Sequence, residues 1–152
     1  MAVQLRSCRT GTVVSFSNIF TLVVINRSSG AISWKVGPPM LASQHGATPL
    51  PNGNLLILDD GPHRSDDGLH YLRILEIDPR ADSVVWQYQD RPSVNFLSPL
   101  ISNAQRLWNG NTLINEGIFG RFFEVTQDGD VERSGGRTSE RRAIRGSFAA
   151  SR

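Results

Sequence analysis

The sequence lacks several features that would assign it to a function class at once. Cys8 is the one cysteine in 152 residues, so an intrachain disulfide is excluded and cysteine usage identifies no redox compartment. No apolar run reaches the 18 or so residues that a membrane span needs, and we predict no membrane span. No stretch repeats its apolar residues with a period of 3.6 over three turns, which argues against a helical domain.

Positive charge is scarce except at the end of the chain. The formal net charge is +2, but residues 1–131 have ten basic and twelve acidic side chains, whereas residues 132–152 have six arginines and two glutamates. The basic character therefore belongs to the last residues, and we predict no nucleic-acid partner for the body of the chain. Residues 132–152 are rich in Arg, Ser and Gly, a composition that predicts a disordered tail.

The first residues have the rough order of a signal peptide. Arg6 and Arg9 precede an apolar stretch, but Ser15, Ser17 and Asn18 interrupt it and no small-residue cleavage site follows. We find no convincing signal peptide and assign no compartment. Read with a period of two, the same stretch predicts two short strands on either side of the interruption.

Short strands and explicit turns fill most of the chain. The candidate strands are rich in β-branched or aromatic residues and lie between clusters of Gly, Pro, Asn and Asp. Asn52-Gly53 and Asn109-Gly110 supply the positive φ angles that tight hairpins require. The sequence therefore predicts an all-β fold built of antiparallel hairpins. The predicted strands are residues 21–25, 31–36, 54–58, 72–77, 83–88, 111–115 and 121–125.

Two types of hairpin recur along the chain. The type with an Asn-Gly turn covers residues 43–58 and 100–115, and the type that ends in tryptophan covers residues 22–35 and 72–88. A third copy of the second type begins at Arg121. Together the two hairpins make a four-stranded unit of about 50 residues, the size of one propeller blade. We therefore predict antiparallel four-stranded blades of a β-propeller, about two and a half of them, over residues 13–131, after an N-terminal segment of residues 1–12.

The third copy breaks off where a tryptophan is expected. By register with Trp34 and Trp86, a tryptophan should stand at Arg133, yet the composition changes there in the middle of a strand. A truncated gene or a shifted reading frame would produce this pattern, and the chain would then be a fragment of a larger propeller. The alternative is a natural, solvated tail.

The order of these motifs resembles the arylsulfotransferase-like (aryl-sulfate sulfotransferase) β-propeller family. The strings that carry the resemblance are HGATPLPNGN, LRILEID, VVWQY and SNAQRLWNGNTLINEG, within residues 22–131. The resemblance implies a six-bladed propeller that moves a sulfuryl group from a phenolic sulfate ester to a phenolic acceptor. It also implies a transiently sulfated channel histidine, with histidine, arginine and asparagine side chains stabilising the developing charge. It implies no cofactor.

The resemblance directs attention to polar residues on the innermost strands. His45 precedes the first PNGN hairpin, and a neutral imidazole is a good nucleophile near pH 7. His45 is therefore the candidate catalytic residue, although it could instead hydrogen-bond a neighbouring loop. By the 57-residue offset its counterpart is Ser102. The candidate substrate-binding residues, which could offer amides and guanidinium groups to a sulfate, are Asn103, Gln105, Arg106 and Arg121.

Other recurring residues favour structural roles. Arg73 and Arg121 recur beside Glu76 and Glu124, a pattern that favours salt bridges within each copy. Trp34 and Trp86 end equivalent strands and are expected to pack between blades, with an aromatic platform for a cofactor such as a quinone as the weaker alternative.

The loop of residues 58–71 contains four aspartates and two histidines, which are possible metal ligands. Its spacing fits no known metal motif, so we predict a solvated acidic loop and no metal site.

Three hypotheses about function remain. They are an arylsulfotransferase-like enzyme that we expect to be inactive as this chain alone, a non-catalytic propeller module that binds a ligand or protein, and a nonfunctional gene fragment. Two and a half blades cannot close a channel, and their terminal strands would be exposed edges that can pair with other chains. We therefore expect little or no activity from the isolated chain, with self-association through edge strands.

Overall fold

A computed structural model shows an all-β chain with three antiparallel sheets. It describes residues 11–16, 19–61, 71–98 and 101–136. The first sheet contains β1 (Gly11–Phe16), β2 (Thr21–Asn26) and β3 (Ile32–Val36). The second contains β4 (Gln44–Pro49), β5 (Leu55–Asp59), β6 (Arg73–Asp78) and β7 (Ser83–Tyr88). The third contains β8 (Ser102–Arg106), β9 (Thr112–Glu116), β10 (Arg121–Val125) and β11 (Val131–Gly136).

The prediction of an all-β fold is confirmed. Each of the seven predicted strands is present, with boundaries within one residue of those expected. β1 and β2 also form on either side of residues 17–18, as the period of two indicated. Within the described ranges there is no α-helix, η3 (Ser93–Asn95) is a short 3₁₀ turn, and no helix there is long and apolar enough to cross a membrane.

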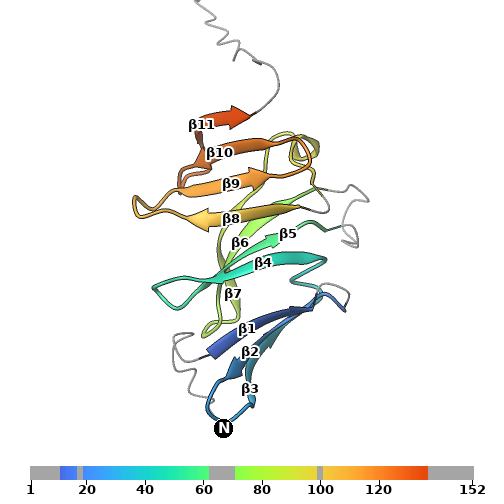
Figure 1. The fold of residues 1–152 in the computed structure, drawn as a ribbon, viewed down its shortest axis with the longest axis vertical. Helices are drawn as coiled ribbons and strands as arrows, with labels where there is room; N and C mark the ends of the chain where they lie inside the picture. The colour runs from blue at the N-terminus through green and yellow to red at the C-terminus, as the bar shows by residue number, and fades with distance from the viewer. Residues whose placement is uncertain (1–10, 17–18, 62–70, 99–100, 137–152) are drawn as a thin grey trace, which may run out of the picture.

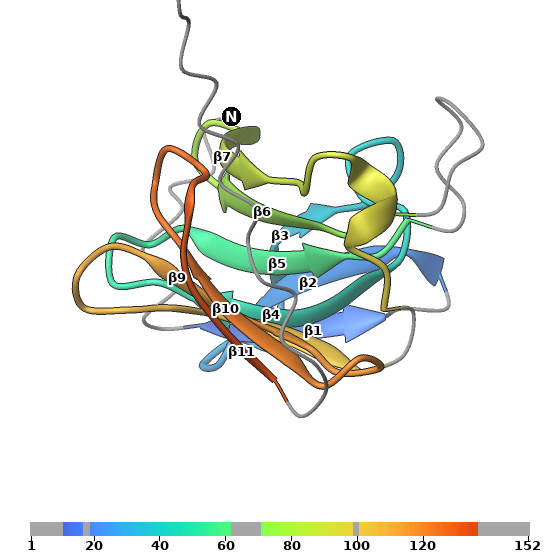
Figure 2. The same cartoon turned by 90° about the horizontal axis from the view of Figure 1, so that it is seen from above.

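The three sheets are stacked along the long axis of the molecule (Figure 1). Within each sheet, every strand pairs with its neighbour in the sequence, so that β4, β5, β6 and β7 follow one another across the second sheet (Figure 2). The Asn-Gly turns close the β4–β5 and β8–β9 hairpins, and their glycines have φ angles of 90° and 89°. The observed architecture is therefore three sequential antiparallel meanders.

The three sheets share the same irregularity in the pairing of their last two strands. The register between the last two strands shifts after Val24 in the first sheet, after Glu76 in the second and after Glu124 in the third. These three residues occupy equivalent positions, which makes β1, β2 and β3 the counterparts of β5, β6 and β7. The strong local twist that such a bulge imposes is thus built into every copy.

Two apolar cores hold the stack together, one on each face of the second sheet. β5 is buried along its whole length because alternate side chains enter opposite cores. The core shared with the first sheet contains Leu22, Val24, Trp34, Val36, Leu41, Leu55, Ile57, Leu75 and Ile77. The core shared with the third sheet contains Leu50, Leu56, Leu58, Leu72, Ile74, Tyr88, Phe96, Ala104, Ile114, Phe123 and Val125.

The tryptophans connect consecutive sheets, which confirms that they pack between them. Trp34 lies in the core between the first and second sheets, and its Nε1 donates to Asp82 Oδ1 at 2.6 Å. Trp86 packs against the next core, and its Nε1 donates to the carbonyl oxygen of Gln127 at 2.7 Å. Arg133 stands opposite Glu124, as Trp86 stands opposite Glu76, so the predicted register of the third copy is confirmed.

The last strand continues beyond the predicted start of the tail at residue 132. β11 pairs with β10 from Val131 to Gly136. Antiparallel pairing uses backbone N–H and C=O groups, so a strand can form in a stretch whose side chains are mostly polar. The remaining residues assigned to the tail, 137–152, lie outside the described residues. At the other end, β1 begins at Gly11, inside the segment predicted to precede the blades.

Candidate functional site

A buried acid and an arginine secure the connection that leads into β4. Asp59, the last residue of β5, accepts hydrogen bonds from the backbone N–H groups of Ala42 and Ser43, both at 2.9 Å. Its other carboxylate oxygen accepts from Arg73 Nε at 2.9 Å. Arg73 also donates to the carbonyl oxygen of Met40 at 2.9 Å. The pair therefore fixes the path of the chain just before β4, the first strand of the second sheet.

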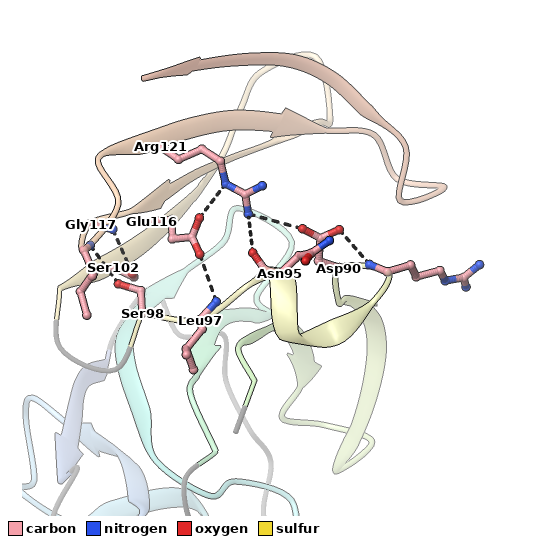
Figure 3. Close-up of polar contacts among 10 residues, drawn as sticks. Asp90, Asn95, Leu97, Ser98, Ser102, Glu116, Gly117 and Arg121 are labelled. Carbon is pink, nitrogen blue, oxygen red and sulfur yellow. Dashed lines mark hydrogen bonds and ion pairs between the residues drawn. The ribbon is translucent and has the colours of Figure 1, made fainter. Parts of the chain in front are cut away.

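The third sheet contains the same arrangement at the equivalent positions (Figure 3). Glu116, the last residue of β9, accepts from Arg121 Nε at 2.6 Å and from the backbone N–H of Leu97 at 3.0 Å. Arg121 also donates to the carbonyl oxygen of Asn95 at 3.3 Å and approaches Asp90 Oδ2 at 3.4 Å. We call each acid–arginine pair, Asp59–Arg73 and Glu116–Arg121, a connection clamp.

The expected salt bridges within the R-x-x-E motifs are not the ones that form. Arg73 pairs with Asp59 rather than Glu76, and Arg121 pairs with Glu116 and Asp90. Side chains three positions apart on a strand point to opposite faces of the sheet, so an arginine cannot meet the glutamate of its own motif. The structural role predicted for both arginines is nevertheless observed.

The glutamates of these motifs bind the Asn-Gly-Asn turns. Glu76 Oε1 accepts from the side-chain amides of Asn52 at 3.0 Å and Asn54 at 2.6 Å. Its Oε2 accepts from Arg106 of the third sheet at 2.7 Å, and the Arg106 guanidinium lies 4.5 Å from the ring centroid of Trp86. The motif therefore anchors a turn and joins two sheets.

The third sheet repeats the turn anchor. Glu124 Oε1 accepts from the side-chain amides of Asn109 at 3.0 Å and Asn111 at 2.8 Å. The recurrence of PNGN and LWNGN in the sequence thus has a structural cause, since each turn needs a glutamate on the third strand of its sheet.

The four predicted substrate-binding residues occupy different environments. Arg106 is 13% exposed and engaged with Glu76, and Arg121 belongs to a connection clamp and stacks on Phe123. Asn103 and Gln105 are exposed on β8, and Asn103 Oδ1 accepts from the next backbone N–H at 2.9 Å. Their substrate-binding roles stay predictions.

An aromatic cluster packs beneath the clamp of the third sheet. The rings of Tyr88, Phe96 and Phe123 have centroids 5.6 to 5.9 Å apart and contact one another in tilted or edge-on geometry. Burial, with a smaller contribution from the charge of Asp90, raises the pKa of Tyr88 to about 12. The phenol therefore stays neutral over the physiological range and belongs to the core.

His45 forms a pair with a buried aspartate that directly follows β5. Its Nε2 lies 2.8 Å from Asp60 Oδ2. The side chain of Asp60 is 2% exposed and that of His45 is 31% exposed, so the carboxylate lies inside and the imidazole reaches the surface. No hydrogen bond from the described residues reaches His45 Nδ1. The alternative prediction, that His45 hydrogen-bonds a neighbouring loop, is confirmed, because Asp60 is the first residue of the loop that follows β5.

A β-bulge sets the position of His45. The register between β4 and β5 shifts between His45 and Thr48, and Gly46 within the shift has a φ of 48°. β8 pairs with β9 without such a shift. Bulges of this kind re-aim a side chain next to a functional site in many proteins.

The bulge also changes which residue corresponds to His45 in the third sheet. His45 stands opposite Leu58, and the residue in that place on β8 is Asn103, opposite Asn115. Adding a constant offset of 57 residues to position 45 gives Ser102, because such an offset does not include the extra residue in β4. Ser102 Oγ instead accepts from the N–H of Gly117, the residue that follows the clamp acid (Figure 3).

Asn103 lies beside this bulge. A Cβ placed on Gly46 would stand 2.6 Å from Asn103 Oδ1, so the amide occupies the space that a side chain at position 46 would need. β4 and β8 are neighbours in the stack (Figure 1). The structure therefore brings His45, Asp60 and Asn103 to one region, whereas Arg106 and Arg121 serve sheet–sheet and clamp contacts.

Sequence reasoning missed Asp60 as a partner of His45. It was grouped with the acidic loop, although it directly follows the last residue of β5, and a residue there lies next to the start of β4 in an antiparallel pair. The remaining acidic and histidine residues of that loop, at positions 63, 66, 67 and 70, lie outside the described residues. Among the residues that are described, no group of three or more His, Cys, Asp or Glu side chains could hold a metal ion.

Comparison with known proteins supports the fold alone. No family model matches the chain, and neither does any curated protein. Among solved structures, the chain is similar to a crystal structure of a protein of unknown function from Bacteroides caccae, with 18% sequence identity and a TM-score of 0.62. The match covers 87% of this chain and 44% of that chain, so the chain spans less than half the length of that neighbour.

Proposed function

We propose that the three sheets are blades of a β-propeller and that the chain contributes His45 as the nucleophile of a sulfuryl-transfer site. The observation that carries this proposal is that the His45–Asp60 pair departs from the repeat. Three features recur in the second and third sheets: the connection clamps, the glutamate contacts to the Asn-Gly-Asn turns, and the bulges that follow Glu76 and Glu124. Contacts that recur in this way hold the sheets together. The pair and the β4 bulge do not recur in the third sheet, which favours a role other than stability.

The proposed chemistry suits the surroundings of His45. Histidine forms covalent intermediates in group transfer when a neighbouring group fixes its orientation. The partly exposed ring can meet a substrate, and the amide of Asn103 can donate to sulfuryl oxygens that gain charge in the transition state. A phenolic sulfate ester is the donor class that agrees with the motifs shared with arylsulfotransferase-like propellers.

Full turnover needs cationic groups that stabilise the transferred sulfuryl group, and among the described residues the arginines of β6, β8 and β10 are already paired with acids. Arg73, Arg106 and Arg121 are held by Asp59, Glu76 and Glu116. We therefore expect the isolated chain to accept a sulfuryl group slowly and to turn over little.

The test is a burst experiment with 4-nitrophenyl sulfate. The full chain at high concentration is mixed with this donor, and release of 4-nitrophenolate is followed by absorbance. We expect slow release that levels off near one equivalent per chain and is lost in His45→Ala. A matched variant, Gln105→Ala, changes another exposed polar side chain and should lower the rate by less. Release that is absent, or equal in wild type and His45→Ala, would contradict the proposal.

A second candidate is a non-catalytic module that binds protein, including further copies of itself. Large apolar side chains are exposed on the third sheet: Trp108 is 98% exposed, Phe119 is 59% and Phe122 is 50%. Trp108 and Phe119 lie in the turns at opposite ends of β9, and Phe122 lies on β10 itself. Exposed apolar surface is typical of interaction sites where it is contiguous. Light scattering over a range of chain concentrations tests it, with Phe122→Asp compared with Val85→Asp on β7, whose valine is 51% exposed. We expect Phe122→Asp to reduce association and Val85→Asp to leave it unchanged.

A further inference from the structure

We infer that Asp60 is a positioning residue that holds the Nε2 proton of His45, so that Nδ1 is the nitrogen that reacts. This inference rests on the proposed function, because it assigns a reactive atom to the same histidine. It adds a residue that the sequence motifs did not identify. It also predicts a protonation pattern that can be observed without any substrate.

The surroundings of Asp60 indicate that its side chain serves His45. The carboxylate is buried, and among the described residues its Oδ1 accepts no hydrogen bond, while Oδ2 meets His45 Nε2. Asp59, one residue earlier, binds two backbone N–H groups and an arginine. Burying a carboxylate without such compensation is costly, and structures retain such groups chiefly where they have a task.

The geometry selects one tautomer of the imidazole. An ionised carboxylate can only accept, so the nitrogen 2.8 Å from Asp60 Oδ2 must carry the proton. In a neutral imidazole the other nitrogen, Nδ1, then has the lone pair. This is the division of roles by which a buried aspartate orients a catalytic histidine in hydrolases, here with the histidine itself as the nucleophile.

The transfer step balances with this assignment. The Nδ1 lone pair forms a bond to sulfur as the bond between sulfur and the phenolic oxygen breaks, and the electron pair leaves with the phenolate. The ring keeps its Nε2 proton and becomes positively charged, which the Asp60 carboxylate stabilises. An acceptor phenol then attacks sulfur, and the electron pair of the nitrogen–sulfur bond returns to Nδ1. The acceptor loses its phenolic proton to water, and the phenolate that left in the first step takes a proton from water, so the protons balance over the two steps.

The test combines nitrogen NMR with the burst assay. In ¹⁵N-labelled chain at a pH where His45 is neutral, the imidazole shifts should show the Nε2–H tautomer. Asp60→Asn keeps the shape but allows the amide to donate to Nε2, so the proton should move to Nδ1. We expect the burst rate to fall by about 10²- to 10⁴-fold, as loss of the correct tautomer does elsewhere. Asp78→Asn, which alters an aspartate paired with Arg80 at the far end of β6, should change neither.

The outcomes separate this inference from the proposed function. An Nδ1–H tautomer in the wild-type chain overturns the inference, and this measurement does not depend on the folding of any variant. An unchanged tautomer in a folded Asp60→Asn chain also overturns it. The expected tautomers without any His45-dependent burst would refute the sulfuryl-transfer proposal and leave Asp60 as the residue that positions His45.

Discussion

Replacement of Glu76 by glutamine tests the contacts that join the second and third sheets. Glutamine retains an oxygen that can accept from Asn52 and Asn54, but its amide nitrogen would face Arg106, donor against donor. Removing one partner of a buried ion pair costs about 3 to 5 kcal/mol. Because the side chains of Glu76 and Arg106 are 11% and 13% exposed, we expect the lower end, a loss of about 3 kcal/mol in the free energy of unfolding.

Urea unfolding followed by tryptophan fluorescence measures this loss. With a slope of about 2 kcal/mol per molar urea, the midpoint of Glu76→Gln should fall by about 1.5 M. Glu124→Gln is the matched control, because Glu124 anchors the equivalent turn and is more exposed. It should cost about 1 kcal/mol, the usual value for a modified hydrogen bond. Equal midpoints for the two variants would refute the assignment of the cross-sheet ion pair as the larger contribution.

Three further changes test other parts of the structure. Gly117→Ala should destabilise the chain by several kcal/mol in the same urea assay, because the new Cβ would lie 1.6 Å from the carbonyl oxygen of Ile101; a loss under about 1 kcal/mol would contradict this packing. Stability should fall as the pH rises from about 10 towards 12, since the raised pKa of Tyr88 means that the folded state holds the proton more tightly than the unfolded state; Tyr88→Phe should remove this part of the slope. Trp34→Phe keeps an aromatic ring but loses the hydrogen bond to Asp82, and should lower the thermal midpoint by an amount that corresponds to about 1 to 2 kcal/mol, whereas an unchanged midpoint would show that this bond contributes nothing.

The strands could be predicted because local chemistry determines them. Short runs of apolar residues between Asn-Gly turns leave little choice of secondary structure, and the spacing of Trp34 and Trp86 aligned the copies correctly as far as Arg133. β11 was assigned in part to the tail because the prediction depended on side-chain composition, whereas its pairing with β10 uses the backbone.

The contacts of the candidate site could not be predicted from spacing. The partners of Arg73 and Arg121 lie on the preceding strand, so they depend on the pairing register rather than on the distance along the chain. The bulge at Gly46 adds one residue to β4, which is why a constant offset misplaced the counterpart of His45. Asp60 became a candidate only when the folded chain placed its carboxylate against the ring.

The position of the second sheet between two apolar cores has a consequence for how the molecule opens. The first and third sheets each share one core with it, so either can detach while the other core remains intact. Stability in such a linear array is approximately the sum of the stability of each unit and the coupling between neighbours. Amide hydrogens of β5 and β6 should therefore exchange with solvent most slowly, and those of β3 and β11, at the ends of the array, should exchange first.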